Sequence, residues 1–374
     1  MGAYRIAVLP GDGVGADVID AARKVLDAIG FEAEYKVGDI GWEFWRGEGN
    51  PLPERTIDLL NSTDCCLFGA ITSKPKEEAA RELAPRLQEK GLVYSSPIVG
   101  LRQRFNLHTN LRPCKAYAGN PLNLRDDIDL VVFRENTEGL YSGVEWHPVP
   151  PAVREAFDTH PKMKRFRDVS SDDIAISTRI FTREGCQAIL RDAFEYAAKH
   201  GYPTVTVVEK PNVIRETSGL MVREARKLAA QYAGIELWET NIDAMCMWLV
   251  KNPQDYGVLV SSNMFGDILS DLAAQLVGGL GFACAGNIGD HYAVFEPTHG
   301  SAPKYVGQNK VNPIATIRSA KMMLDYLGET ELASKIEAAV TQVIQEERIQ
   351  TYDMGGTSTT TQMAEAIAAA AKEA

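Results

Sequence analysis

Apolar residues along this chain form two kinds of segment. Short apolar runs of strand length occur at residues 5–10, 64–70, 128–133, 204–209 and 257–261. Longer segments, in which apolar residues return every three or four positions as on a helix, occur at residues 14–29, 53–61, 182–200 and 218–233. Residues 31–37 alternate between apolar and polar side chains and predict one more strand. Because strands and helices alternate along the chain, the pattern predicts an α/β protein.

Two segments depart from this alternation. Residues 147–168 combine four prolines with many charged residues and few apolar anchors, so they predict an excursion from the core, a subunit-contact arm. Residues 362–374 are rich in alanine and predict a helix that packs on the core.

The length of 374 residues exceeds what one hydrophobic core usually serves, so two lobes are expected. The chain has no internal repeat and no low-complexity linker, which indicates that the lobes are interleaved along the sequence. The formal charge of −11 argues against binding nucleic acid or an anionic membrane through the overall field. An anionic substrate would therefore need a local cluster of arginines.

Features of targeting and of metal or disulfide scaffolds are not expected. The first six residues do not form a basic region followed by a long apolar stretch, so no signal peptide is predicted. Apolar runs stay below the roughly 18 residues of a membrane span. The six cysteines show no C-x-x-C spacing, which favours a reducing, cytoplasmic location without structural zinc or disulfides.

Two carboxylates lie four positions apart at Asp267 and Asp271, between the apolar run 256–260 and the glycine-rich segment 277–281. At this spacing both side chains leave one face of a helix. Such a pair is often only a solvated helix face, but a strand end that leads into a helix is where α/β enzymes bind ligands. Mg²⁺ and Mn²⁺ prefer carboxylate oxygens, so the pair predicts a metal site. Asp243, in an otherwise apolar stretch, needs a partner, and the same metal would supply one.

Arginines are dense in one part of this acidic chain. Arg102, Arg104 and Arg112 lie close together in sequence, and Arg134 follows the buried run 130–133. Guanidinium groups bind carboxylates with two parallel hydrogen bonds, so three converging arginines would hold a substrate with two or three carboxylates. The alternative is that each arginine pairs with a surface acid.

Two further residues are candidates for proton transfer. Lys210 ends the apolar run 204–209, and a lysine near other cations can serve as a proton acceptor. Tyr141, on a turn after Arg134, could return a proton to an enol. Each residue alone is more often a structural polar group.

The glycine turn at residues 11–15 follows a strand and opens a helix. Its spacing is G-x-G-x-G, which does not match the G-x-G-x-x-G of the common dinucleotide-binding fold. We therefore interpret it as a structural turn.

Taken together, these residues resemble the isocitrate/isopropylmalate dehydrogenase family of metal-dependent β-decarboxylating dehydrogenases. The resemblance covers nearly the whole chain and is carried by residues 11–18, 101–113, 129–143, 208–213, 263–271 and 295–313. It implies an isocitrate/isopropylmalate dehydrogenase-like two-domain α/β fold that differs from the common dinucleotide-binding fold. The large, cofactor-binding domain would comprise residues 1–107 and 278–374. The small domain, residues 108–277, would carry the dimer interface and an arm at about 146–180.

The resemblance also implies roles for the candidates. Arg102, Arg112 and Arg134, with Ser96 and Asn212, would bind the substrate, a di- or tricarboxylic acid. Asp243, Asp267 and Asp271 would hold Mg²⁺ or Mn²⁺, with Asp243 and Lys210 presented across the interface of a homodimer. Lys210 would help to remove the hydroxyl proton, the metal would stabilise the enolate as CO₂ leaves, and Tyr141 would protonate carbon. The cofactor would lie against His299, Gly300, Ser301 and Ala302, and Asn312.

The cofactor and the substrate are indicated by different loops. Lys304, Tyr305 and Tyr352 resemble the NADP-using isocitrate enzymes, although Gly356 stands where those enzymes carry an arginine, so NADP is expected with NAD possible. Residues 94–99 keep Ser96 but place Ile98 where isocitrate enzymes have asparagine, and they resemble homoisocitrate enzymes. Isocitrate is the first expectation, homoisocitrate the second and 3-isopropylmalate the third.

The same residues bear on two alternative classes of protein. A non-catalytic regulatory subunit of the same fold would be expected to lose catalytic or metal residues, and this chain keeps Tyr141, Lys210 and the three aspartates. A zinc hydrolase would need histidines at ligand spacing, which the sequence does not show.

Overall fold

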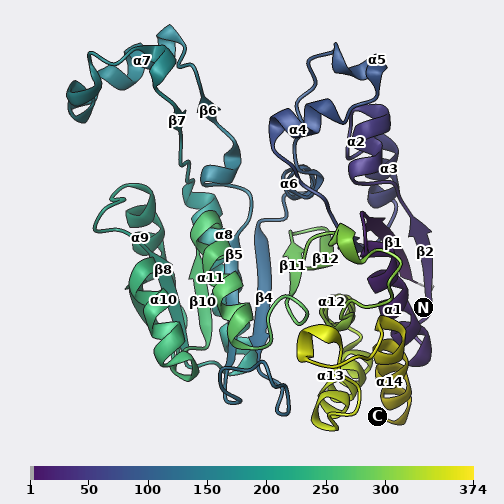
Figure 1. Cartoon of the computed structure of the whole chain (residues 1–374). Helices are drawn as coiled ribbons and strands as arrows, with labels where there is room; N and C mark the ends of the chain where they lie inside the picture. Colours follow the sequence, from purple (N-terminus) through teal and green to yellow (C-terminus); the bar gives the residue numbers. More distant parts are fainter. Residues whose placement is uncertain (1–3) are drawn as a thin grey trace.

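The computed structural model describes residues 4–374, so the first three residues of the predicted large domain lie outside it. A ten-stranded sheet crosses the molecule in the order β2-β1-β3-β12-β11-β4-β5-β10-β8-β9 (Figure 1). Its strands are β1 (Tyr4–Gly11), β2 (Ala33–Val37), β3 (Cys65–Ala70), β4 (Thr109–Lys115), β5 (Asp129–Glu135), β8 (Thr204–Glu209), β9 (Glu236–Asn241), β10 (Val258–Ser261), β11 (Cys284–Ile288) and β12 (Ala293–Pro297). The predicted α/β class is confirmed.

The two ends of the sheet are parallel and its centre is antiparallel. Strands β2, β1, β3 and β12 pair in parallel at one end, and β5, β10, β8 and β9 do so at the other. The pairs β12–β11, β11–β4 and β4–β5 are antiparallel. A common dinucleotide-binding sheet is mostly parallel, so this topology agrees with the failed glycine fingerprint.

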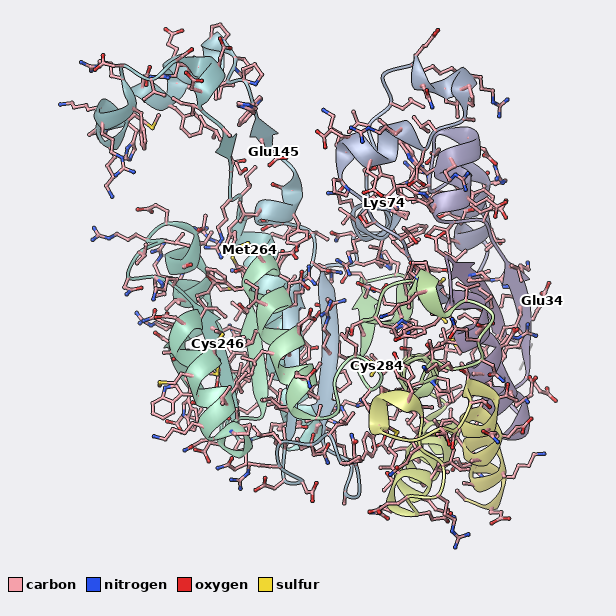
Figure 2. All side chains as sticks on the ribbon, viewed as in Figure 1. Glu34, Lys74, Glu145, Cys246, Met264 and Cys284 are labelled. Carbon is pink, nitrogen blue, oxygen red and sulfur yellow. The ribbon has the colours of Figure 1, made fainter. Side chains whose placement is uncertain are left out.

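Helices cover the sheet in two groups. The group on the β1 side comprises α1 (Gly15–Ala28), α2 (Trp42–Glu48), α3 (Glu54–Asn61), α4 (Lys76–Arg81), α5 (Pro85–Gln88), α6 (Pro97–Arg104), α12 (Ile314–Leu327), α13 (Thr330–Gln345) and α14 (Thr360–Glu373). The group on the β8 side comprises α8 (Arg183–His200), α9 (Thr217–Ala229), α10 (Ile242–Lys251) and α11 (Asn263–Leu276). Figure 2 shows the two sides, with Glu34 on one and Cys246 on the other.

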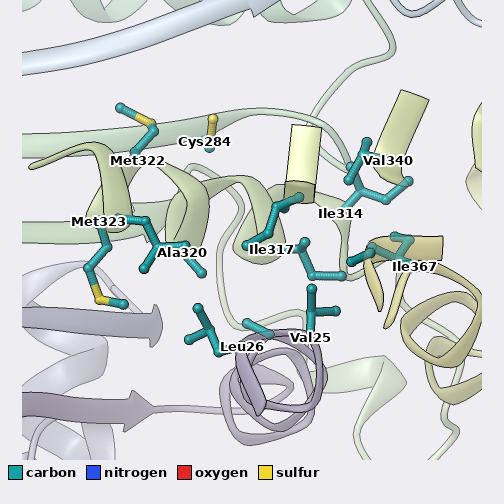
Figure 3. Packing of buried hydrophobic residues seen from close by; sticks show 14 of the residues in the cluster. Val25, Leu26, Cys284, Ile314, Ile317, Ala320, Met322, Met323, Val340 and Ile367 are labelled. Atoms are coloured by element: carbon teal, nitrogen blue, oxygen red, sulfur yellow. The ribbon is translucent and has the colours of Figure 1, made fainter. Parts of the chain in front are cut away.

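Burial of apolar side chains holds each group against its own part of the sheet. On the β1 side, Val25 and Leu26 of α1 pack against Ile317 of α12 and Ile367 of α14, all fully buried (Figure 3). Burying each such side chain stabilises the fold by roughly 1.5–3 kcal/mol. The C-terminal helix therefore packs on the core as predicted. Separate clusters line α8 and α11 on the β8 side.

The predicted excursion is confirmed. Strands β6 (Glu145–Trp146) and β7 (Ile176–Ser177) pair with each other and carry α7 (Pro151–Asp158) away from the body (Figure 1). Every residue from 150 to 180 keeps part of its surface exposed. The role of this excursion as a subunit contact stays a prediction.

Three smaller expectations can be compared with the structure. The helix predicted at 218–233 ends at Ala229, and Tyr232 beyond it stacks on Phe194, with 5.1 Å between the ring centroids. All six cysteines are free, as expected. Within residues 4–374, no helix is both long and apolar enough to cross a membrane.

Candidate active site

A cavity of about 350 Å³ lies where the ends of β3, β5 and β12 meet α6 and α11. Its lining gathers eight of the residues singled out in the sequence, namely Ser96, Arg102, Arg112, Arg134, Tyr141, Asp267, His299 and Gly300. Ligands of α/β proteins commonly bind beyond the carboxyl ends of strands, and Arg134 occupies that position on β5. The expected convergence of three arginines therefore occurs in the structure.

The three arginines are buried and close together. Arg102 is 6% exposed, Arg112 is 8% exposed and Arg134 is 2% exposed. Burial, followed by the charges of Arg102 and Arg112, lowers the pKa of Arg134 to about 9. An anionic ligand would relieve this repulsion, so the cavity favours a carboxylate-rich molecule. Arg104 lies outside it, exposed and 3.9 Å from Glu54.

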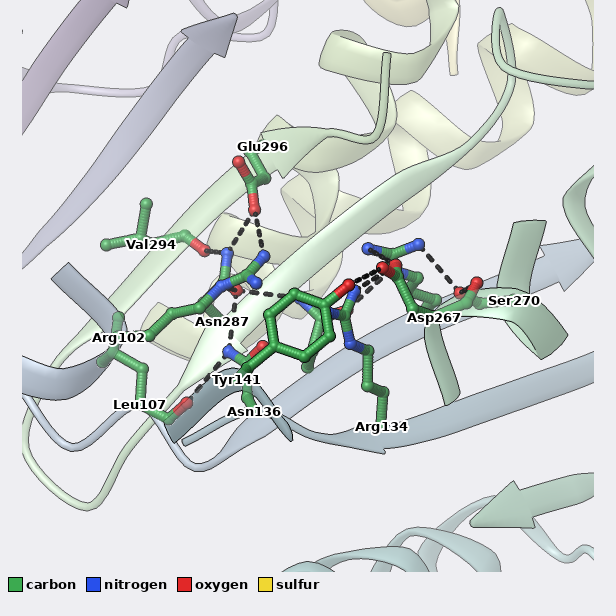
Figure 4. Close-up of polar contacts among 12 residues, drawn as sticks. Arg102, Leu107, Arg134, Asn136, Tyr141, Asp267, Ser270, Asn287, Val294 and Glu296 are labelled. Carbon is green, nitrogen blue, oxygen red and sulfur yellow. Dashed lines mark hydrogen bonds and ion pairs between the residues drawn. The ribbon is translucent and has the colours of Figure 1, made fainter. Parts of the chain in front are cut away.

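Asp267 is the carboxylate at the centre of the cluster (Figure 4). It accepts hydrogen bonds from Arg134 Nη1 and, at 2.7 Å, from the phenol of Tyr141. Its neighbour on α11, Asp271, accepts from Arg112 Nη1 at 3.0 Å. Arg112 also lies 3.5 Å from Asp267, so one guanidinium reaches both carboxylates, as expected for two acids on one helix face.

Tyr141 stands on a short 3₁₀ turn after β5, with the guanidinium of Arg134 5.2 Å from its ring centroid. Burial, and then the hydrogen bond to Asp267, raise the pKa of Tyr141. The phenol therefore keeps its proton at neutral pH, which suits a proton donor.

Three predicted site residues lie elsewhere. Lys210, at the end of β8, forms an ion pair with Asp243 in the first turn of α10. This hydrogen bond lowers the pKa of Asp243. Asn212 follows Lys210 and is exposed. None of the three lines the 350 Å³ cavity.

The expected ligand set of three aspartates is therefore not assembled within one chain. Among residues 4–374, no three His, Cys, Asp or Glu side chains are grouped as metal ligands. The physical reason is that α10 presents Asp243 to Lys210, whereas α11 presents Asp267 and Asp271 to the arginines.

A second cavity of about 500 Å³ adjoins the first. Its lining includes the expected cofactor residues His299, Gly300, Ala302, Tyr305, Asn312 and Tyr352. His299 and Gly300 also line the cavity of the arginines, so the two spaces meet at this loop. Burial lowers the pKa of His299, and its Nε2 is buried without a hydrogen-bond partner in the described chain. A neutral ring with a free nitrogen can bind a polar ligand group.

Ser301 has a different position from its neighbours in this loop. Its Oγ lies 2.6 Å from Thr72 Oγ1, and its carbonyl oxygen accepts a hydrogen bond from Val14 N at 3.0 Å. At Gly13, with φ of 59°, a Cβ atom would lie 2.0 Å from that carbonyl oxygen. The glycine turn is thus structural, as interpreted, and seats the loop that borders both cavities.

Two lysines lie beside the phenol rings of Tyr305 and Tyr352, which line the second cavity. Lys304 Nζ lies 4.7 Å from the ring centroid of Tyr305, and Tyr305 and Tyr352 lie 5.1 Å apart. Lys310 Nζ lies 4.8 Å from the ring centroid of Tyr352. Lys310 had no predicted role, although it stands inside the segment 295–313 that carried the resemblance.

Gly356 cannot carry the arginine expected in NADP-using isocitrate enzymes. A Cβ atom there would lie 2.1 Å from the carbonyl oxygen of Gln350, so any side chain requires the backbone to move. Lys310 instead places a positive charge over the ring of Tyr352.

Comparisons with known proteins agree with this geometry. A model of the family described as isocitrate/isopropylmalate dehydrogenase matches residues 5–367. Protein DlpA of Legionella pneumophila is 40% identical over 97% of this chain, which spans only 58% of that relative. Two relatives are each 39% identical over 99% of both chains: 3-isopropylmalate/3-methylmalate dehydrogenase of Methanocaldococcus jannaschii and isocitrate/homoisocitrate dehydrogenase of Thermus thermophilus.

A solved structure has the same fold. Isocitrate dehydrogenase from Methylococcus capsulatus superposes with a TM-score of 0.86 and 37% identity, over 99% of each chain. The fold expected from the resemblance is therefore confirmed.

Proposed function

This chain belongs to the isocitrate/isopropylmalate dehydrogenase family, and we propose that it oxidises and decarboxylates isocitrate with NADP. The reaction class follows from the family, whose members are decarboxylating dehydrogenases that act on small hydroxy acids with NAD or NADP. The substrate, the cofactor and the role of each residue are our proposal.

One observation supports the proposal most strongly. Three buried arginines converge with Tyr141 on a cavity that meets the proposed cofactor cleft at His299 and Gly300. The arginines would hold the substrate carboxylates, so that the carbon that loses hydride faces this junction. Burial of the guanidinium groups excludes water and strengthens the contacts.

Asp267 and Asp271 fit a divalent metal. They offer hard carboxylate oxygens from one helix face, and the side chain of Asp271 is 61% exposed. Mg²⁺ usually takes one or two protein carboxylates and completes its shell with substrate and water oxygens. When bound, such an ion acts as a Lewis acid on the oxygen of the hydroxyl carbon.

Two residues of the chain would move protons. Lys210 would accept the hydroxyl proton as hydride leaves, and the phenol of Tyr141 would deliver a proton to carbon after CO₂ has left. Because the pKa of Tyr141 is raised, the phenol carries its proton at neutral pH and can donate it at this step.

Lys210 and Asp243 would complete the site of a second copy. They pair with each other outside the arginine cavity, although both would be required for the chemistry. Close to Asp243 in sequence, Met247 and Val250 of α10 are 53% and 56% exposed, and Ile268 of α11 is 51% exposed. This apolar surface supports a homodimer built on α10 and α11, with active sites shared between the subunits.

The two halves of the sheet would act as separate domains. The proposal retains residues 1–107 with 278–374 as the large domain and 108–277 as the small one. The separate apolar clusters on α1–α12–α14 and on α8–α9 support this division. The arginine cavity draws Arg102 from the first domain and Arg134 from the second.

NADP is proposed from the charges around the tyrosines. Lys304 and Lys310 bring two positive charges to Tyr305 and Tyr352 at the edge of the second cavity. Cations and phenol hydroxyls suit the 2′-phosphate that distinguishes NADP from NAD.

The walls of the first cavity favour a tricarboxylate. Ser73, Ser96 and Thr298 add hydroxyl groups to the three arginines, which suits a third carboxylate better than the isopropyl group of 3-isopropylmalate. Ile98 also lines the cavity, so homoisocitrate, which is longer by one methylene group, is the second candidate. The chain is equally identical to a relative named for 3-isopropylmalate and 3-methylmalate and to one named for isocitrate and homoisocitrate, so sequence identity does not distinguish these substrates. The proposed substrate therefore rests on the residues that line the cavity.

A substrate panel tests the proposal. Isocitrate, homoisocitrate and 3-isopropylmalate are each offered with Mg²⁺ and with NADP or NAD, and kcat/KM is followed by nicotinamide absorbance. We expect the highest value for isocitrate with NADP. A higher value for either other acid would replace the substrate, and a higher value with NAD would replace the cofactor.

A further inference from the structure

Each of the three arginines in the cavity is held at Nε by the side-chain carbonyl of an asparagine. Arg102 Nε donates to Asn287 at 2.9 Å, and Arg112 Nε donates to Asn110 at 2.6 Å. Arg134 donates to Asn263 from Nε at 3.0 Å and from Nη2 at 2.8 Å. All three asparagines are fully buried. None of them had a role predicted from the sequence.

The acceptor at each arginine Nε is a neutral amide carbonyl rather than a carboxylate. A buried guanidinium needs hydrogen bonds, and a carboxylate would supply them but would also cancel the positive charge. A neutral acceptor at Nε fixes the orientation of the planar group and adds no negative charge to those that Glu296, Asp267 and Asp271 already place beside the arginines. Three independent occurrences of this arrangement in one cavity indicate a common purpose.

Asn287 joins the arrangement into a network (Figure 4). Besides Arg102, its Oδ1 accepts hydrogen bonds from Asn110 at 2.8 Å and from Asn136 at 2.9 Å. Its Nδ2 donates to Glu296 Oε1 at 2.7 Å. Asn287 and Asn110 are register partners on β11 and β4, where the sheet passes from one proposed domain to the other.

This network connects groups from both sides of the cavity. Arg102 comes from α6 on the β1 side, and Asn136 follows β5 on the β8 side. Asn110 continues the chain of contacts to Arg112, which reaches Asp271. Loss of Asn287 would therefore release Arg102 directly and weaken the support of Arg112.

We propose that Asn287 is a positioning residue for substrate binding, which orients Arg102 and, through Asn110, Arg112. The inference rests on the proposed function only in that the cavity receives a carboxylate-rich substrate. It assigns Asn287 no contact with the substrate.

The test compares a tricarboxylate probe with turnover. Citrate binding to chelator-treated protein is measured by calorimetry at fixed ionic strength for the wild type and for Asn287→Asp. The carboxylate can accept the same three hydrogen bonds, but it cannot donate to Glu296 and it places a negative charge beside both Arg102 and Glu296. We expect citrate to bind at least about tenfold more weakly. In turnover, the substrate KM should rise similarly while the cofactor KM stays within about twofold, which a general loss of structure would not produce.

A second variant and a control keep the result decisive. Asn110→Ser removes the acceptor of Arg112 without adding charge, and it should also weaken citrate binding. Asn120→Ser is the matched control, because Asn120 is equally buried but bonds only to backbone groups of Leu122 and Val277. If Asn287→Asp does not fold, Asn110→Ser decides the question.

The outcomes separate this inference from the proposed function. If the wild type binds citrate but oxidises none of isocitrate, homoisocitrate and 3-isopropylmalate, the proposed substrates are wrong. Weaker citrate binding by the variants would still support the positioning role in that case. Citrate binding within twofold of wild type in folded Asn287→Asp and Asn110→Ser would overturn the role. A wild type that binds no citrate would overturn it as well.

Discussion

The phenol of Tyr141 donates a 2.7 Å hydrogen bond to Oδ2 of Asp267, so the proposed proton donor directly contacts a proposed metal ligand. Both groups also contact Arg134, which places its guanidinium over the phenol ring and bonds to the carboxylate. Proton delivery and metal binding are therefore expected to depend on each other at this point of the site.

Removal of the Tyr141 hydroxyl should affect the late stage of the reaction most. Tyr141→Phe keeps the ring beside Arg134 but has no proton to give, so we expect kcat to fall by about 10²–10⁴-fold. Oxidation of the substrate should persist longer than release of the decarboxylated product. Rapid-quench analysis of both products checks this, and a loss of less than tenfold would mean that another group donates the proton.

Activity should require a divalent metal. We expect activity to disappear in excess chelator and to return with Mg²⁺ or Mn²⁺, because Asp267 and Asp271 present hard oxygen ligands. Asp267→Asn should lose most turnover while the protein stays folded. Arg104→Gln, which changes an exposed arginine outside the cavity, serves as the control. Full activity in chelator would contradict the metal assignment.

Mixed dimers should recover activity from two inactive chains. If Lys210 serves the site of a second copy, a dimer of one Lys210→Met chain and one Tyr141→Phe chain contains one intact site. Random mixing would then restore about a quarter of wild-type activity, since half of the dimers are mixed and each has one working site. Each variant alone is the control. No recovery in verified mixed dimers would place Lys210 in the site of its own chain.

Stability should depend on the protonation of His108. Its Nε2 lies 3.1 Å from Asp192 Oδ2, and this hydrogen bond raises the pKa of His108 despite burial. Because the folded pKa lies above the unfolded value, the stabilisation is complete below about pH 6.5 and is lost as pH rises through the folded pKa.

Urea unfolding across pH 5.5 to 8.5 measures this dependence. The wild type should lose free energy of unfolding toward high pH relative to His108→Gln, which cannot titrate. Asp192→Asn, which removes the partner charge, should reduce the same pH dependence. Parallel pH profiles for the wild type and His108→Gln would show that the pair contributes nothing.

Local pattern was enough to predict much of the fold, and strand ends were enough to bring the arginines together. Arg134 could be placed because it directly follows a buried strand, and Asp267 and Asp271 because helical spacing fixes their common face. The network around Asn287 was out of reach, because its partners Arg102 and Asn136 are separated from it by more than 150 positions along the chain. No periodicity reports such contacts.

The position of Asp243 shows a second limit. Its apolar neighbours in sequence predicted a carboxylate that needs a partner, but the side chain is 67% exposed and pairs with Lys210 rather than with the other two aspartates. A sequence cannot separate a ligand supplied within one chain from one supplied to another copy, because both arrangements place the same demand on the residue.

Cofactor preference tests the proposed phosphate role of Lys304 and Lys310. Lys304 is stacked on Tyr305, and Lys310 reaches the rings of both Tyr305 and Tyr352, so the cluster survives loss of either lysine alone. We expect Lys304→Gln and Lys310→Gln each to lower kcat/KM for NADP by about tenfold, the effect of one charge-assisted contact.

Reversal of the preference should need repulsion as well as lost attraction. In Lys304→Asp with Tyr305→Ile, the new carboxylate opposes a 2′-phosphate but can accept hydrogen bonds from the ribose hydroxyls of NAD. NADP efficiency should therefore fall by more than tenfold while NAD efficiency holds or improves, as measured by kcat/KM for both cofactors in every variant. Lys335→Gln, which changes a lysine of α13 rather than one stacked on Tyr305 or Tyr352, is the charge-matched control. If the wild type already prefers NAD, the lysines do not bind phosphate, and the absence of an arginine at position 356 correctly indicated NAD. Homoisocitrate would then become the first candidate substrate, because the NADP-type loop is what placed isocitrate ahead of it.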